Sequence, residues 1–328
     1  MVTIYRDDDA DPAVLGGRTI AVIGYGNQGR AQALNLRDSG VDVIVGCPPD
    51  SYREQAVEDG MEVLGPAEAA ARGDVVLLLT PDEVQPAVYG ESIGPAMREG
   101  KALGFASGYN IYFKLIEPPP FVDVIMVAPR MIGVAVRSRF LAGQGFPCLI
   151  AVGRDATGRA QAVALAIARA IGGTKAGAFA SSFEEEVLID LLAEQFLWAG
   201  IGKLCRVFFE TLVAAGCTPE TVATEMYLSG EMVEVARAMV ERGFFKQLDL
   251  HSQTSQYGQL SRADRVLGRG AEERARQFLE AIRNGAFARE WADEQKRGKP
   301  LLARLKKEAF AHPLNDIERK LSRSGPRD

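Results

Sequence analysis

Short apolar runs alternate with helix-like amphipathic stretches through the first half of the chain. Six such runs predict buried strands of a parallel sheet. They are TIAVIG (19–24), VDVIVG (41–46), DVVLLL (74–79), ALGFA (102–106), VDVIMVA (122–128) and PCLIAVG (147–153). The stretch GRAQAVALAIARAIGG (158–173) predicts a strong helix that ends at a glycine pair. This alternation is typical of a doubly wound α/β domain.

After about residue 181 the strand-like runs stop and long helical periodicities follow. The helical stretches cover residues 183–215, 218–242, 271–285 and 286–310. The charged tail beyond Leu314 closes with SRSGPRD, and we expect it to be frayed. The pattern therefore predicts an α/β domain over residues 1–181 and an all-helical domain over residues 182–328.

Composition excludes several classes of function. A net charge of −5 leaves no electrostatic footprint for nucleic acid or an anionic membrane. No apolar run reaches transmembrane length, and the start MVTIYRDDDADP is too acidic for a signal peptide. The four cysteines are widely spaced without a CxxC pattern, which argues against zinc and for reduced thiols. We expect a cytoplasmic globular protein.

The segment IAVIGYGNQG carries the first candidate chemistry. It contains Gly24-Tyr25-Gly26-Asn27-Gln28-Gly29, a GxGxxG that follows a predicted strand and opens a predicted helix. The first glycine permits a tight turn, the second lets the backbone approach a pyrophosphate, and the third lets the helix pack on the strand. In this context the motif predicts dinucleotide binding, although a glycine turn can also serve packing alone.

The end of the second predicted strand selects the form of the dinucleotide. In GCPPDSYRE (46–54), Asp50 is placed to hold the ribose hydroxyls of NADH, because an acid repels a 2′-phosphate. Ser51 and Arg53 instead favour a 2′-phosphate and hence NADPH. We favour NADH, with the alternative that Asp50 only caps the following helix.

The segment LLLTPDEVQ (77–85) ends a predicted strand, where a turn usually borders the nicotinamide half of the cleft. Asp82 also fits a helix N-cap with Gln85 at the capping-box position. We assign five residues of this turn to the cofactor: Thr80, Asp82, Glu83, Val84 and Gln85.

Three carboxylates, Glu186, Asp190 and Glu194, occur at four-residue intervals in the apolar segment FEEEVLIDLLAEQFLWAG. On an α-helix each interval advances about 40° beyond a full turn, so the three share one face. Their apolar neighbours predict a buried helix, where carboxylates are costly unless a cation or hydrogen bonds satisfy them. Oxygen ligands suit Mg²⁺ or Mn²⁺. The alternatives are a solvated acidic stripe or internal salt bridges.

Several motifs occur in a specific order over nearly the whole chain. They are IYRDDDADPAVLGGRTIAVIGYGNQG, LTPDEVQPAVY, GYNIYF, VDVIMVAPR, DATGRAQAVALAIARAIGGTKAG, FEEEVLIDLLAEQ, FETLVAAGCTPE, TSQYG and NGAFAREWADEQKRGKPLLARLKKEAFAHPL. In this order the chain resembles the short, class I form of ketol-acid reductoisomerase.

The resemblance implies an α/β Rossmann-type doubly wound parallel sheet followed by an all-helical, knotted domain that forms a homodimer or a larger homo-oligomer. It implies two Mg²⁺ ions and NAD(P)H. It also implies alkyl migration in a 2-hydroxy-2-alkyl-3-oxo acid such as 2-acetolactate, then reduction to a 2,3-dihydroxy acid. In the family pattern Asp190 bridges the metals, Glu194 ligates one, and Glu186 is a ligand or lies just behind one.

Two departures from the family pattern fall at the chemistry. Ser107 stands where the family has a histidine, and Arg130 where it has a lysine. Arginine keeps the positive charge but does not readily share a proton, and serine cannot act as a base near neutral pH. We expect both residues in the catalytic site, where reduction could survive with impaired migration.

Other departures surround the cofactor loop. Asn27 and Arg30 replace a serine and a histidine of the family. Met131-Ile132-Gly133 replaces a Gly-Pro-Gly turn, and we assign Gly133 to the cofactor.

The second metal-binding helix of the family carries two glutamates four residues apart, whereas TEMYLSGEMVE offers Glu225 and Glu231, six apart. Counting back from Gly243 matches Glu231 to the second glutamate and Tyr227 to the first. Counting forward from Pro219 matches Glu225 to the first. We favour Glu231 as a metal ligand and leave Glu225 against Tyr227 open.

The stretch HSQTSQYG matches the substrate side of the family pattern. Ser252 there matches the family's substrate-binding serine. His251 beside it is new, and we expect a structural histidine more than a replacement for the one lost at Ser107.

Two other functions stay open from the sequence. One is a divergent homologue that reduces another 2-keto or ketol acid without isomerisation. The other is a nucleotide-binding protein that has lost catalysis, against which the retained buried carboxylates argue, because unneeded buried charges are costly.

Overall fold

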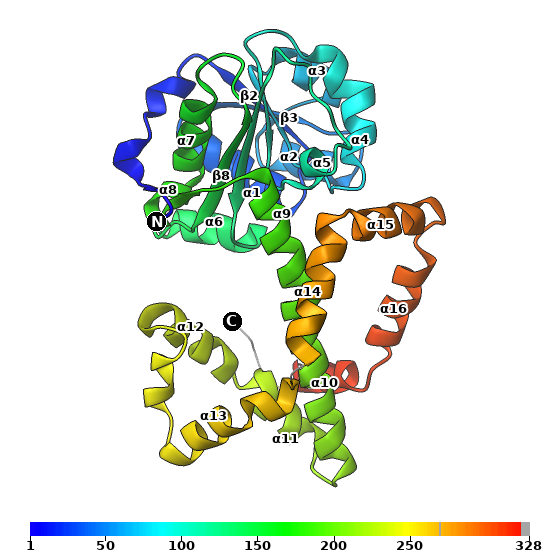
Figure 1. The fold of residues 1–328 in the computed structure, drawn as a ribbon. Helices are drawn as coiled ribbons and strands as arrows, with labels where there is room; N and C mark the ends of the chain where they lie inside the picture. The colour runs from blue at the N-terminus through cyan, green and yellow to red at the C-terminus, as the bar shows by residue number, and fades with distance from the viewer. Residues whose placement is uncertain (269, 323–328) are drawn as a thin grey trace. The chain divides into compact units, whose positions relative to one another are not determined.

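The computed structural model of the chain describes residues 1–268 and 270–322. It divides into two compact units, Met1–Ile189 and Asp190–Asp328 (Figure 1). Every helix among the described residues is too short or too polar to cross a membrane.

The first unit is built on a nine-stranded sheet in the order β1-β9-β8-β7-β6-β5-β2-β3-β4. Its strands are β1 (Ile4–Tyr5), β2 (Thr19–Ile23), β3 (Asp42–Gly46), β4 (Glu62–Leu64), β5 (Val75–Leu78), β6 (Ala102–Phe105), β7 (Asp123–Pro129), β8 (Cys148–Arg154) and β9 (Ala178–Ala180). The six strands from β4 to β7 pair in parallel. This confirms the predicted doubly wound α/β fold.

The prediction that all six apolar runs form parallel strands was wrong for the last of them. Strand β8 runs antiparallel to β7, with Pro129 opposite Cys148. The nine-residue helix α6 (Gly133–Leu141) returns the chain to the same end of the sheet that β7 reached. An apolar run indicates burial on both faces and carries no information on strand direction. Strands β1, β4 and β9, of two or three residues, were too short for the pattern to predict.

Helices cover both faces of the sheet, and β2 shows why its run is uniformly apolar. Ile20 and Val22 pack in one core with α1 (Asn27–Asp38) and α7 (Ala160–Ile171). Ala21 and Ile23 point into the other core with α3 (Pro66–Arg72). Successive side chains of a strand face opposite sides, so a strand covered on both sides has no polar face to spare.

The second unit is helical, as predicted, but its long helices are interrupted. The helices are α9 (Phe183–Leu192, which begins in the first unit), α10 (Ala199–Ala214), α11 (Pro219–Ala223), α12 (Glu231–Arg242), α13 (Gln253–Leu267), α14 (Gly270–Arg283), α15 (Ala286–Lys296), α16 (Pro300–Phe310) and α17 (Leu314–Ser322). Single π-helical turns at Ala193–Trp198 and Thr224–Leu228 interrupt two of the predicted helices. Left-handed residues Gly298 and Lys299 split a third.

Two details correct the sequence expectations for this unit. Helix α13 was not predicted. The chain beyond Leu314, expected to be frayed, forms α17 as far as Ser322, and residues 323–328 lie outside the described residues.

Candidate functional site

The glycine motif forms the turn between β2 and α1. Gly24 has φ +96°, and a Cβ built on Gly29 would lie 2.2 Å from the Gly24 carbonyl oxygen. Gly26 is the N-cap of α1 and has no side chain to cap the helix. A Cβ built on Gly26 would meet nothing within 4 Å. The turn thus leaves an open space in front of the first backbone N–H groups of a helix, which fits the pyrophosphate of a dinucleotide.

Thr80 closes the turn from β5. Its Cγ2 would lie 2.8 Å from a Cβ on Gly24, and its buried Oγ1 has no hydrogen-bond partner within residues 1–268 and 270–322. This hydroxyl lies at the switch point of the sheet, where β2 and β5 are neighbours, and a bound group could satisfy it.

The turn after β5 is braced by two buried amides. Helix α4 (Gln85–Val88) has Val84 as its N-cap, so the predicted capping role of Asp82 was wrong. Gln85 Nε2 instead donates to the Thr80 carbonyl at 2.8 Å and to Asp82 Oδ1 at 3.3 Å. Asn110, which sequence reasoning missed, donates to Gln85 Oε1 at 2.9 Å. No sequence signal could have identified Asn110, because a single amide in GYNIYF forms no recognisable motif, and its role is evident only from its contacts in the structure.

Asp50 is the N-cap of α2 (Ser51–Glu58) and accepts from the Tyr52 and Arg53 N–H groups at 3.0 Å each. Arg53 donates to the main-chain carbonyls of Cys47 and Leu64, both at 3.0 Å. The guanidinium that was considered for a 2′-phosphate is therefore committed to holding the ends of β3 and β4 together.

A cavity of about 530 Å³ lies over α1 and reaches the glycine turn. It is lined by residues of three helix starts, Gly26 and Asn27 of α1, Ser51 of α2 and Gly133 of α6. The Gly133 backbone approaches that of Asn27 so closely that a Cβ on Gly133 would fall 2.1 Å from the Asn27 carbonyl oxygen.

The turn after β7 is tied to the same loop. Gln28 Nε2 donates to the Met131 carbonyl at 2.9 Å. The departure Met131-Ile132-Gly133 therefore lies against Asn27 and Gln28 of the glycine motif.

Ser107 and Arg130 lie at the carboxyl ends of the neighbouring strands β6 and β7, as their sequence positions imply. Buried Glu186 joins these two strand ends: Oε1 pairs with Arg130 Nη1 at 3.0 Å, and Oε2 accepts from the Gly108 N–H at 2.7 Å. The Glu186 side chain is 2% exposed and that of Arg130 is 29% exposed. Ser107 Oγ accepts from the Tyr109 N–H at 3.2 Å. At these two strand ends the first unit therefore places the guanidinium of Arg130, ion-paired with buried Glu186, and the hydroxyl of Ser107.

Asp190 and Glu194 lie one turn apart at the start of the second unit. The expectation of a buried carboxylate face was wrong for Glu194, which is exposed and stands in the π-helical turn. Apolar neighbours expected to be buried are exposed too, with Trp198 at 63%. Within either unit, the described residues contain no group of three or more His, Cys, Asp or Glu side chains that would enclose a metal ion.

Glu225 and Glu231 lie on separate elements, because left-handed Gly230 ends the π-helical turn before α12 begins. Both glutamates are exposed. The Tyr227 hydroxyl hydrogen-bonds to Glu318 of α17.

Ser252 and His251 of the HSQTSQYG stretch bond to residues close to them in the sequence. Ser252 is the N-cap of α13 and accepts from the Ser255 N–H at 3.3 Å. His251 Nε2 lies 2.9 Å from Gln247 Oε1.

Cysteine chemistry finds no support at the cofactor turn. Burial raises the pKa of Cys47, which follows β3, to about 11, and burial raises that of Cys148 to about 12. Both thiols stay protonated near neutral pH, and the thiolate is the nucleophilic form.

Both halves of the chain match known family models. Residues 14–177 match the model described as acetohydroxy acid isomeroreductase, NADPH-binding domain, and residues 183–326 match ketol-acid reductoisomerase, C-terminal domain. The ketol-acid reductoisomerase (NADP(+)) of Pyrobaculum calidifontis is 45% identical over 319 residues, which cover 97% of each chain. That of Saccharopolyspora erythraea is 43% identical over 320 residues, covering 97% of this chain and 96% of the relative.

A solved structure is similar over the same extent. It is an NADH-preferring ketol-acid reductoisomerase from an uncultured archean, with a TM-score of 0.95 and 40% identity, covering 99% of this chain and 100% of that chain.

Proposed function

The chain belongs to the ketol-acid reductoisomerase family, and we propose that it converts a 2-acetolactate-type acid into a 2,3-dihydroxy acid with a nicotinamide cofactor. The observation that carries the proposal is full-length identity of 43–45% to named reductoisomerases, together with an open glycine turn that fits a dinucleotide.

The reaction has two stages with different demands. In the first, the C2 hydroxyl loses its proton and becomes a ketone, while the alkyl group moves with its bonding electrons to C3. The C3 carbonyl oxygen takes up the negative charge and then a proton. In the second, hydride from the reduced nicotinamide adds to C2 and a proton adds to its oxygen. Both stages place charge on oxygen, so the site must supply positive charge and exclude water.

Arg130 supplies a permanent positive charge at the end of β7. Because a guanidinium does not readily give up a proton, we assign it to charge stabilisation and to binding the substrate carboxylate. Glu186 orients Arg130 through the 3.0 Å ion pair and fixes the strand end at Ser107 through the Gly108 N–H. The Ser107 hydroxyl can hydrogen-bond to a substrate oxygen but does not act as a base.

We assign Mg²⁺ to Asp190 and Glu194, with Glu231 as a further candidate ligand and Ser252 on the substrate. Two carboxylates fit Mg²⁺, which keeps several waters and commonly uses one or two carboxylates plus substrate oxygens. Both carboxylate oxygens of Glu186 are engaged, with Arg130 and with the Gly108 N–H, so we assign Glu186 to orienting Arg130 rather than to ligating the metal. When bound, Mg²⁺ supplies Lewis-acid stabilisation of developing oxyanions.

The test is turnover of two substrates by purified protein with Mg²⁺ and NADH. The proposal expects oxidation of NADH with 2-acetolactate and also with the already migrated 3-hydroxy-3-methyl-2-oxobutanoate. Turnover of the second acid alone would leave a reductase that does not isomerise. Turnover of neither acid would overturn the proposed function.

We propose NADH as the preferred cofactor, because Asp50 places a negative charge at the start of α2 and Arg53 is committed to main-chain carbonyls. Asp50→Asn keeps an N-cap side chain but removes the charge. We expect kcat/KM with NADPH to rise about tenfold, corresponding to about 1.4 kcal/mol of relieved repulsion, and kcat/KM with NADH to change little. Initial rates with both cofactors measure the ratio.

Glu54→Gln is the matched control, because it removes the same charge from an exposed position one turn into α2. If Asp50→Asn and Glu54→Gln change the ratio of kcat/KM with NADPH to kcat/KM with NADH equally, Asp50 does not select the cofactor.

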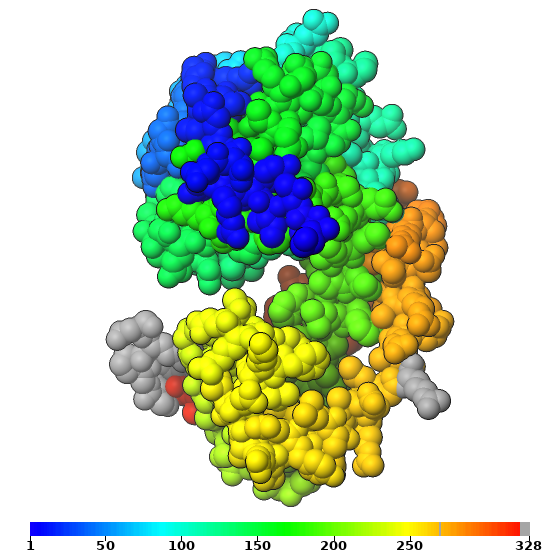
Figure 2. Space-filling model, turned by 60° about the vertical axis from the view of Figure 1, so that its left-hand side comes forward, coloured from blue at the N-terminus to red at the C-terminus, as the bar shows by residue number. Residues whose placement is uncertain are grey.

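We also propose a homodimer or larger homo-oligomer. Apolar side chains of the second unit are exposed along α10, among them Ile201, Leu204, Val207 and Phe208 at 36–44%. Further exposed apolar side chains lie in the segment from α12 to α13, which is yellow at the surface of the second unit in the space-filling view (Figure 2). So much exposed apolar surface marks an interaction site. Sedimentation should give at least twice the 35.4 kDa chain mass, and a monomer would refute this.

A cytoplasmic location completes the proposal. It is supported by the four cysteines, all of which are free thiols.

A further inference from the structure

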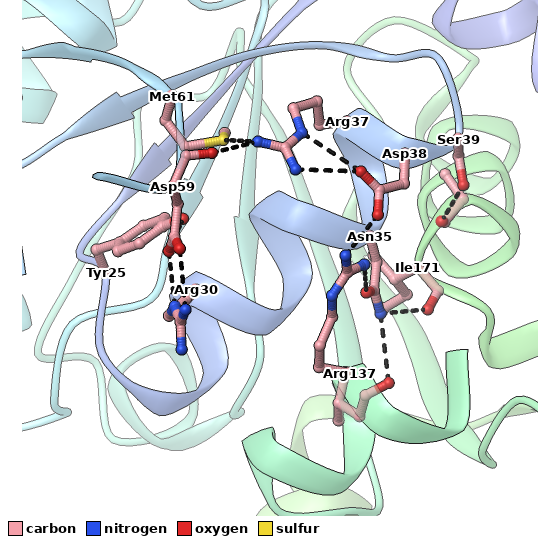
Figure 3. Close-up of polar contacts among 12 residues, drawn as sticks. Tyr25, Arg30, Asn35, Arg37, Asp38, Ser39, Asp59, Met61, Arg137 and Ile171 are labelled. Carbon is pink, nitrogen blue, oxygen red and sulfur yellow. Dashed lines mark hydrogen bonds and ion pairs between the residues drawn. The ribbon is translucent and has the colours of Figure 1, made fainter. Parts of the chain in front are cut away.

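Asp59 collects polar contacts from the glycine turn and from α1 (Figure 3). Its carboxylate accepts from Arg30 in a bidentate pair, with Nε at 2.6 Å and Nη2 at 2.9 Å. The same carboxylate accepts from the Tyr25 hydroxyl at 3.0 Å. Its main-chain carbonyl accepts from Arg37 Nη1 at 2.6 Å. One residue thus joins the loop, two turns of α1 and the end of α2.

The local sequence explains why these groups meet. Arg30 and Arg37 are seven residues apart, two turns of helix, so both lie on the same side of α1. Asp59 is the C-cap of α2, and its N–H bonds to the Gln55 carbonyl at 3.0 Å. Left-handed Gly60 then turns the chain toward β4. Backbone contacts therefore hold Asp59 in place independently of its side-chain contacts.

Tyr25 is the part of the loop that Asp59 holds. It stands between Gly24 and Gly26, and glycines leave a backbone more freedom than any other residue does. Tyr25 is 2% exposed and packs in the hydrophobic core of the first unit. Fixing this side chain at its hydroxyl limits where the flanking glycines can place the N–H groups that face the open space.

Charge reinforces the geometry. The Arg30 guanidinium holds the pKa of the Asp59 carboxyl below its usual range, and burial together with Asp59 raises the pKa of Tyr25. At neutral pH the carboxylate is ionised and the phenol is a donor. Because the pKa of Asp59 is lower in the folded than in the unfolded protein, its ionised carboxylate stabilises the fold at any pH above the unfolded-state pKa. This stabilisation is lost as the pH falls through the folded-state pKa.

We propose that Asp59 is a positioning residue for the nicotinamide dinucleotide, holding the glycine turn in the shape that receives the pyrophosphate. This inference rests on the proposed function. Asp59 acts through Tyr25 and Arg30 and does not itself contact the cofactor. No pattern in the sequence marks it, because it lies 30 residues after Gly29 at the end of another helix.

The pyrophosphate is common to NADH and NADPH, so the proposal makes a specific demand. Loss of Asp59 must weaken both cofactors by the same factor, whereas loss of the Asp50 charge must change their ratio. The loss must also fall on cofactor binding and KM rather than on kcat at saturating cofactor.

The experiment is a fluorescence titration of NADH and NADPH against purified full-length protein, without substrate. Asp59→Asn removes the charge and should raise both dissociation constants about tenfold, the scale of a lost charge-assisted contact. Tyr25→Phe removes only the hydroxyl and should raise them about threefold, the scale of a neutral hydrogen bond. Glu62→Gln is the control, because it removes the charge of an exposed glutamate on β4 whose ion-pair partner is Arg72 of α3.

The outcomes separate the two proposals. If wild-type protein binds neither nucleotide, the proposed function fails. If wild type binds NADH while Asp59→Asn and Tyr25→Phe bind it within twofold of the Glu62→Gln control, the positioning role is overturned. A change confined to one of the two nucleotides would also overturn it. Should Asp59→Asn fail to fold, Tyr25→Phe decides alone.

Discussion

Replacing Asp190 by asparagine will lower kcat/KM for 2-acetolactate by about 10³-fold or more, because the proposed Mg²⁺ site would lose a charged ligand for a hard cation. An amide oxygen is neutral, so it holds Mg²⁺ less well and leaves developing oxyanion charge without a counter-charge. Asp190 is the residue to which we assign Mg²⁺, and it lies within residues 183–326, which match the C-terminal domain of the family.

Two readouts check this prediction. Calorimetry with Mg²⁺ alone reports binding, and NADH oxidation in chelator-treated protein titrated with Mg²⁺ reports activity. Glu184→Gln is the matched control, since Glu184 is an exposed acid in the first turn of the same helix. If Asp190→Asn retained Mg²⁺-dependent turnover within tenfold of this control, Asp190 would not be a metal ligand.

Gly29→Ala will both destabilise the first unit and impair dinucleotide binding. The new Cβ would sit 2.2 Å from the Gly24 carbonyl oxygen, so one backbone must move away from the other. We expect the free energy of unfolding to fall by about 3 kcal/mol, as for other overpacked sites. NADH binding should weaken about 10²-fold, the scale of a displacement of about 1 Å.

Gly26→Ala is the informative partner of this variant. A Cβ there meets nothing within 4 Å and the N-cap φ is −73°, so we expect stability to change little. The methyl group nevertheless occupies the space assigned to the pyrophosphate, so NADH binding should still be lost. Urea unfolding and NADH titration measure the two effects. A Gly26→Ala variant that binds NADH normally would place the cofactor elsewhere.

Local signals explain why much of the first unit could be predicted. The strand runs are uniformly apolar because both faces of the sheet are covered, as Ile20 and Ala21 show by packing in separate cores. The glycine motif could be recognised from residue types alone, because a turn with φ +96° at position 24 favours glycine. These features depend on residues that are close together in the sequence, so they could be predicted from it.

Less of the candidate site could be predicted from the sequence, because its contacts join residues that are far apart in the chain. The sequence positions of Ser107 and Arg130 marked them as candidates. Their link was not predictable, because Glu186 bonds to Arg130, 56 positions away, and to Gly108, 78 positions away. The helical period placed Glu194 on the face of Glu186 and Asp190, and a π-helical turn interrupts that period. The capping signal at Asp82 was overridden because Gln85 bonds to the Thr80 carbonyl and α4 starts later.

The sequence by itself determined the class of fold, the dinucleotide turn and the family, because these follow from periodicity, residue type and motif order. Only the tertiary structure decided the direction of β8, the commitment of Arg53 to main-chain carbonyls, and the convergence of Tyr25 and Arg30 on Asp59. The physical reason is that hydrogen bonds and ion pairs act over about 3 Å in space. Sequence separation gives no measure of that distance until the chain has folded.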